Sequence, residues 1–155
     1  MKEKVNLTCI EEIEQWLHDN NVLLIEDNSL MDYSCLNKAF TIKYKESTCM
    51  VYAPAAILSH VEKRCVLLHE IYHCLIKKGF YHLNSSPFKR KAIEGRVKNK
   101  MVKDLIPFDT LVDLIKKNYA KYEIAEELEV TEELINDAYT IYESKFIESN
   151  LINRN

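Results

Sequence analysis

Glycine and proline are scarce in this sequence of 155 residues, which has only two glycines and three prolines. Both residues interrupt helices, so their scarcity predicts a mainly helical chain with few breaks. The apolar fraction of 47% and the charged fraction of 29% are those of a globular protein and exclude an extensively disordered chain. The length is sufficient for one ordinary domain with a hydrophobic core.

Three further features are missing. None of the five cysteines forms a C-x-x-C pair, no apolar run approaches the roughly 20 residues that span a bilayer, and the first residues lack the apolar core of a signal peptide. We therefore expect a cytoplasmic protein with reduced thiols. The net charge of −3 does not indicate a general nucleic-acid binder.

Helix start signals recur along the chain. The capping-box spacing S/T-x-x-E begins at Thr8 and again at Ser59, and Ser86-Pro87 combines a good N-cap with proline at the first helical position. Apolar residues follow each signal at helical spacing. We expect helices over residues 9–19, 59–78 and 86–105, a short helix capped by Asp109, and a last helix from Thr131 to Phe146.

Strand signals are confined to the first third of the chain. Apolar residues alternate with polar ones over residues 40–44 and 49–53, which predicts a hairpin, and residues 22–25 resemble a short strand. The expected fold is α+β: mainly helical, with a small antiparallel sheet near the N-terminus. We expect a single domain over residues 1–155, in which residues 1–107 carry the sheet and the active-site helices and residues 108–155 form a helical extension.

The segment His69-Glu70-Ile71-Tyr72-His73 lies within the second expected helix. Residues four apart share one helix face, so His69 and His73 can direct two imidazoles at one ion while Glu70 stands beside it. This H-E-x-x-H arrangement supplies two nitrogen ligands and a carboxylate that activates a bound water. The flanking residues are apolar, so the helix should be buried, where these polar groups are costly without a partner such as zinc. The alternative is that both histidines are core residues bonded to backbone, with Glu70 on a partly exposed edge.

A catalytic zinc needs a third protein ligand. Glu94 is our choice, and His82, Asp104 and Glu62 are alternatives. Cys65 is rejected, because it would lie about 12 Å from His73 along a straight helix axis. Glu94 is the only acidic residue between Phe88 and Lys103, where the seven basic residues are Lys89, Arg90, Lys91, Arg96, Lys98, Lys100 and Lys103.

These motifs together resemble the ImmA/IrrE metallopeptidases of phages, integrative elements and bacterial stress responses. The resemblance covers about residues 50–142 and is strongest over 66–107. It is carried by Leu68–Cys74, Gly79-Phe80-Tyr81, Glu94-Gly95-Arg96 and Leu105-Ile106-Pro107. It implies a zincin-like fold, a zinc site of His69, His73 and Glu94, and cleavage of a helix-turn-helix repressor. Small residues and an asparagine usually follow the third ligand in the family, whereas this chain has Val97, Lys98, Lys100 and Met101.

The resulting prediction is a zinc-dependent endopeptidase that cleaves a regulatory protein at a specific site. Glu70 would be the general base, and Tyr81 or His82 could donate to the oxyanion, unless they are ordinary loop residues. The alternative function is a non-proteolytic, zinc-binding anti-repressor that acts by protein contact. Two imidazoles and a carboxylate suit zinc, although iron and manganese also accept these ligands.

Two charged segments remain. Residues 122–131 resemble the family's tail and have the apolar spacing of a helix-turn-helix, with Glu129 where the tight turn often has glycine. Between Tyr122 and Glu148, however, nine acidic residues accompany the single Lys145, which argues against DNA binding. We interpret this tail as a packing or protein-contact element. The basic third helix is either a solvated face or a docking surface for an acidic partner.

Overall fold

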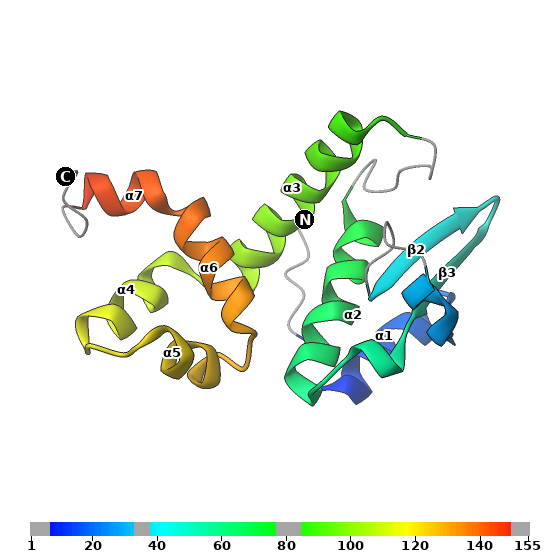
Figure 1. The fold of residues 1–155 in the computed structure, drawn as a ribbon, viewed down its shortest axis with the longest axis horizontal. Helices are drawn as coiled ribbons and strands as arrows, with labels where there is room; N and C mark the ends of the chain where they lie inside the picture. Colours follow the sequence, from blue (N-terminus) through cyan, green and yellow to red (C-terminus); the bar gives the residue numbers. More distant parts are fainter. Residues whose placement is uncertain (1–6, 33–37, 77–84, 150–155) are drawn as a thin grey trace. The chain divides into compact units, whose positions relative to one another are not determined.

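The computed structural model describes residues 7–32, 38–76 and 85–149. The chain divides into two compact units, Met1–Val97 and Lys98–Asn155 (Figure 1). The boundary falls inside helix α3 (Pro87–Leu105), whereas the sequence predicts the C-terminal extension to begin at residue 108. No helix in the described part of the chain is long and apolar enough to cross a membrane.

The first unit contains a sheet of three strands, β1 (Val22–Glu26), β2 (Ala39–Tyr44) and β3 (Ser47–Tyr52). Strand β3 is central, and it pairs antiparallel with β2 and parallel with β1. The predicted hairpin is therefore confirmed. The prediction of an antiparallel sheet is wrong for the pairing of β1, which makes the sheet mixed.

The direction of β1 follows from where the chain enters the hairpin. Glu26 at the end of β1 and Ala39 at the start of β2 both pair with Tyr52, so β1 ends and β2 begins at the same end of the sheet. Strand β2 then runs opposite to β1, and β3 returns between them in the direction of β1. Periodicity reports which residues share a face but carries no information on strand direction.

Helices α1 (Ile10–Asp19) and α2 (His60–Leu75) cover one face of this sheet and contact each other. The core between them includes Ile13, Met50 and Ile71, each fully buried. On the opposite face, the 3-10 helices η1 (Asn28–Asp32) and η2 (Pro54–Ala56) contact each other, and Leu30 packs in a small cluster with Val51 and Ala53.

Helix α2, which carries the H-E-x-x-H motif, begins as the sequence predicts. The Ser59 hydroxyl accepts a hydrogen bond from the backbone N–H of Glu62 at 3.1 Å, which satisfies one free donor of the first turn. The described helix ends at Leu75, and Gly79, its predicted terminator, lies outside the described residues. Most residues from Cys65 to His73 are buried, which confirms the predicted burial of this helix.

The start of α1 differs by one residue from the prediction. Cys9 is the N-cap, and Thr8 donates from its backbone N–H and its hydroxyl to the carboxylate of Glu12 rather than Glu11. The start of α3 agrees with the prediction, since the Ser86 hydroxyl accepts from the backbone N–H of Lys89 at 3.3 Å.

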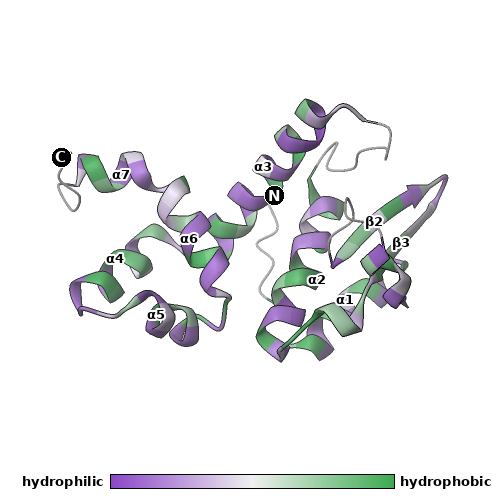
Figure 2. Cartoon of the chain, in the orientation of Figure 1, coloured by the Kyte–Doolittle hydropathy of each residue, from purple (hydrophilic) through white to green (hydrophobic). Residues whose placement is uncertain are grey.

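The second unit consists of the end of α3 followed by α4 (Phe108–Lys116), α5 (Lys121–Glu127), α6 (Glu132–Ile141) and α7 (Glu143–Glu148). Both hydrophobic and hydrophilic segments appear along these helices (Figure 2). Each buries apolar residues, among them Leu111, Ile124, Ile135 and Phe146.

Three details of this unit bear on the predictions. Pro107 is the N-cap of α4, and the predicted cap Asp109 lies in the first turn, where its carboxylate still favours the helix dipole. Thr131 caps α6 as expected, but the helix breaks at Tyr142 instead of continuing to Phe146. Glu129 has φ 50, a left-handed conformation that explains why glycine is common in such a turn.

We predict that Ser59→Ala lowers the free energy of unfolding of the first unit by about 1 kcal/mol, because the cap of the motif-bearing helix is lost. Chemical denaturation followed by far-UV circular dichroism measures this change. Ser47→Ala is the matched control, since Ser47 is exposed at the start of β3. Equal stabilities of the two variants would contradict the capping role of Ser59.

Candidate metal centre

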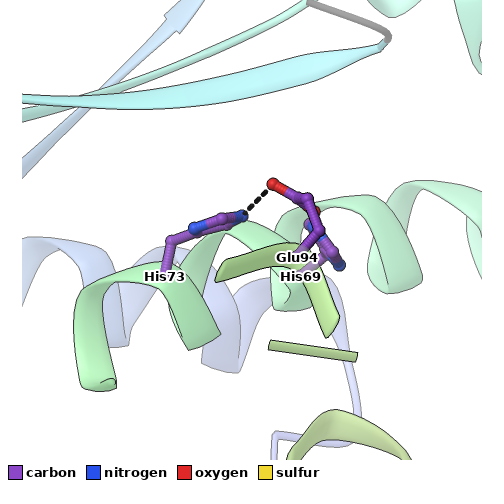
Figure 3. Close-up of side chains that lie close together, drawn as sticks. All are labelled: His69, His73 and Glu94. Atoms are coloured by element: carbon purple, nitrogen blue, oxygen red, sulfur yellow. Dashed lines mark hydrogen bonds and ion pairs between the residues drawn. The ribbon is translucent and has the colours of Figure 1, made fainter. Parts of the chain in front are cut away.

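Three side chains converge at the surface of the first unit. His69 and His73 come from neighbouring turns of α2, and Glu94 comes from the first half of α3 (Figure 3). His69 Nε2 lies 3.0 Å from Glu94 Oε2, and His73 Nε2 lies 3.2 Å from Glu94 Oε1. One carboxylate thus contacts both imidazoles, each through a different oxygen.

The exposure of the three side chains decreases toward the interior. Side-chain exposure is 33% for Glu94, 24% for His69 and 7% for His73. A ligand can therefore approach from the side of Glu94 and His69, while His73 forms the floor of the site. The His69 and His73 rings are inclined at 71° with their centroids 5.1 Å apart, so they meet edge to face and do not stack.

The electrostatics favour an ionised carboxylate. Burial alone would raise the pKa of Glu94, but hydrogen bonds from His69 and His73, together with their charges, outweigh it and hold the pKa well below its ordinary value. Glu94 is therefore a carboxylate at neutral pH, as a metal ligand must be.

The donor set fits zinc. It comprises two imidazole nitrogens and one carboxylate oxygen, which is the ligand type of catalytic zinc sites with three protein ligands. One donor atom from each residue can be chosen so that all three lie within 4.8 Å of one another. Ligands at about 2.1 Å from one tetrahedral ion lie about 3.4 Å apart, so the most widely separated donor atoms close by up to about 1.4 Å when zinc binds. Among the described residues, this is the one such group.

Glu70 lies beside the triad but is turned toward the sheet. Its Oε2 accepts a hydrogen bond of 2.7 Å from the hydroxyl of Thr41 on β2, and only 6% of the residue is exposed. Burial raises the pKa of Glu70, and the charges of His69 and His73 oppose this rise. A carboxyl with a raised pKa holds a proton more readily than an exposed glutamate, which suits a general base.

Thr41 is the residue that sequence reasoning missed. It lies 29 positions before Glu70, and nothing in the sequence indicates which helix β2 contacts. The only available signal was its place as a polar residue between Phe40 and Ile42 in an alternating segment. Alternation separates the two faces of a strand, but it does not show which face a catalytic helix covers.

The alternative ligands behave differently. Glu62 pairs with Lys38 and accepts from the backbone of Leu58, and Asp104 pairs with Lys100 one helical turn away. Cys65 is buried and is not part of the triad, in agreement with its rejection on helix geometry. His82 and the predicted oxyanion donor Tyr81 lie outside the described residues.

Cys74 is also near this site but does not offer a thiolate. Burial raises its pKa to about 12, and the negative charge of Glu70 adds to the effect. In the absence of a metal the thiol therefore stays protonated at neutral pH. Cys74 is not one of the three residues that converge, and their donors are nitrogen and oxygen atoms.

Comparisons with protein-family models, with curated proteins and with solved structures gave no match to this chain.

We predict that Glu94→Gln weakens zinc binding by more than about 100-fold, because one of three ligands and its charge are removed. Competition with a zinc-sensitive chelating dye measures the affinity. Glu62→Gln is the control, since it removes the same charge at the other glutamate considered as a ligand. Full zinc affinity in Glu94→Gln would show that Glu94 is not the third ligand.

Proposed function

We propose that this chain is a zinc-dependent endopeptidase of the ImmA/IrrE type that cleaves a regulatory protein at a specific site. The observation that carries the proposal is the convergence of His69, His73 and Glu94, with the carboxyl group of Glu70 buried beside them. Metal ligands alone would equally suit a structural site. A fourth side chain next to them, the buried carboxyl of Glu70 with its raised pKa, supplies the proton acceptor that hydrolysis requires.

When bound in such a site, zinc supplies Lewis acidity, which makes a water molecule more acidic and polarises a peptide carbonyl. Glu70 provides the proton acceptor. Because Thr41 donates to Oε2 of Glu70, the other oxygen, Oε1, is left to take the proton of the attacking water. Glu70 then returns this proton to the leaving amine, which cannot depart as an anion.

The hydrogen bond from Thr41 also fixes the direction of this transfer. A carboxyl on a glutamate side chain rotates about χ3, whose preferences are broad, so an unrestrained Glu70 would sample several orientations. Thr41 holds one oxygen against β2 at 2.7 Å and so limits the rotation. The folded protein therefore already holds Glu70 in one orientation, and no conformational entropy is lost in ordering it at each turnover.

The substrate we propose is a helix-turn-helix transcriptional repressor of a phage or mobile element, in the cytoplasm. This part of the proposal is supported by the resemblance of the motifs around His69, Glu94 and Pro107 to the ImmA/IrrE metallopeptidases, and fold and site alone do not specify a substrate.

We predict that Glu70→Ala abolishes cleavage of a repressor encoded beside this protein, while zinc content stays at one ion per chain. Loss of the base costs about 100-fold or more in rate, and the ligands are unchanged. Co-expression with the repressor, read by immunoblot and by zinc content after purification, tests this. Relief of repression by both wild type and Glu70→Ala, with the repressor intact, would establish the contact-only mechanism instead.

A second prediction concerns Thr41. Thr41→Val keeps the size of the side chain but removes the hydroxyl, and we expect kcat for the same substrate to fall about tenfold with little change in KM. Thr41→Ser keeps the hydroxyl and should retain most of the activity. Zinc affinity should be equal in both variants. A rise in KM at constant kcat would show that Thr41 contacts the substrate instead of orienting Glu70.

A further inference from the structure

Helix α3 carries basic residues along its whole length, but their surroundings differ between the two units. In the second unit, Lys98 Nζ lies 2.9 Å from Asp137 Oδ2, and Lys100 pairs with Asp104. Two of the cations in this half of the helix are thus balanced by carboxylates of the same unit.

The first half of α3 lacks this balance. None of its four cations forms an ion pair with a carboxylate of the described residues, and Glu94, the single acidic residue among them, is already bonded to the two histidines. Three of the four cationic residues are exposed, and Arg90 is half-buried. The four residues are Lys89, Arg90, Lys91 and Arg96.

The helix sorts these four residues onto two flanks. With 3.6 residues per turn, Arg90 and Lys91 lie within about 40° and 60° of the direction of Glu94, one turn nearer the start of the helix. Lys89 and Arg96 lie about 140° and 160° away from it. Arg90 and Lys91 lie on opposite sides of Glu94, and the buried Ile93 and Val97 lie between Arg90 and Lys89.

We propose that Arg90 and Lys91 form a specificity site that selects an acidic segment of the substrate beside the scissile bond. The proposal rests on the peptidase function proposed above. Arg90 stands about 6 Å along the helix axis from Glu94, and its side chain extends by a similar distance. An extended peptide advances about 3.3 Å per residue, so the recognised aspartate or glutamate lies roughly two to four residues from the cleaved bond.

The chemistry of the pair favours a carboxylate. Arginine presents a planar fork of donors that matches a carboxylate in a bidentate geometry, and the neighbouring lysine adds a point charge. Because neither side chain is ion-paired with a carboxylate in the described part of the chain, binding a ligand breaks no such pair. A basic substrate segment would be repelled at the same place, so the pair discriminates in both directions.

Direct binding tests the proposal without requiring cleavage. Zinc-loaded Glu70→Ala protein is titrated with fluorescent peptides that are identical except for an Asp-Glu or an Asn-Gln pair, and binding is followed by anisotropy. We expect the acidic peptide to bind about tenfold more tightly, with a preference that shrinks as salt rises. Arg90→Gln combined with Lys91→Gln should remove the preference.

Lys89→Gln combined with Arg96→Gln is the matched control, because it removes the same charge from the same half of α3 on the other flank. This variant should keep the acidic preference. Equal binding of both peptides to the parent protein, equal loss in the two double variants, or equally tight binding of a single-stranded oligonucleotide would each overturn the proposal.

A second measurement separates this inference from the peptidase function. Wild-type protein is incubated with a proteome-derived peptide library, and new termini are identified by mass spectrometry against Glu70→Ala. The specificity site is supported if the wild type prefers acidic residues two to four positions from the cleaved bond. The variant that combines Arg90→Glu with Lys91→Glu should prefer basic residues at these positions instead. Cleavage without any acidic preference overturns the site but not the peptidase. Absence of cleavage counts against the peptidase function alone. The binding titration then tests whether Arg90 and Lys91 form the specificity site.

Discussion

The carboxylate of Glu94 is the contact on which the site depends. Its two oxygens bond two different histidines of α2, so a single side chain of α3 sets the spacing between the helices at this point. Burying His73 or Glu94 alone would be costly, because each would lose water without gaining a partner. Together they offset that cost, and among the described residues no buried side-chain nitrogen or oxygen lacks a hydrogen-bond partner.

The inner side of the site is formed by the core of the first unit. Leu68, Ile71 and Tyr72 of α2, which are neighbours of the two histidines along the helix, are all buried. Glu94, with one-third of its side chain exposed, is the most exposed of the three residues of the triad.

The register of the hairpin determines the surroundings of Glu70. Thr41 pairs with Met50, whose side chain is fully buried, and both belong to the face of the sheet that α2 covers. A slip of one residue between β2 and β3 would turn Thr41 away and present an apolar neighbour, Phe40 or Ile42, to the carboxyl group. The chemistry of a helix residue thus depends on strand pairing that is set by a turn several residues away.

The sequence predicts features that depend on residues close together in the chain better than features that depend on distant residues. The helix carrying His69 and His73, its cap at Ser59 and its burial depend on residues within one or two turns, and all three were predictable. Glu94 was found because it is a lone acidic residue in a basic segment. The parallel pairing of β1 and the contact of Thr41 with Glu70 arise from chain crossings and tertiary packing, which leave no periodic signal.

If the proposed substrate is a repressor, the proposed specificity site on α3 constrains which part of it could be cut. A DNA-binding surface is basic, since it must meet phosphates. Arg90 and Lys91 would repel such a surface and so keep the DNA-binding helices away from the metal centre. The two proposals are therefore compatible only if the cleaved segment lies outside that surface, in an acidic stretch of the target. Cleavage there would separate the DNA-binding part from the remainder of the repressor without any need to unfold it.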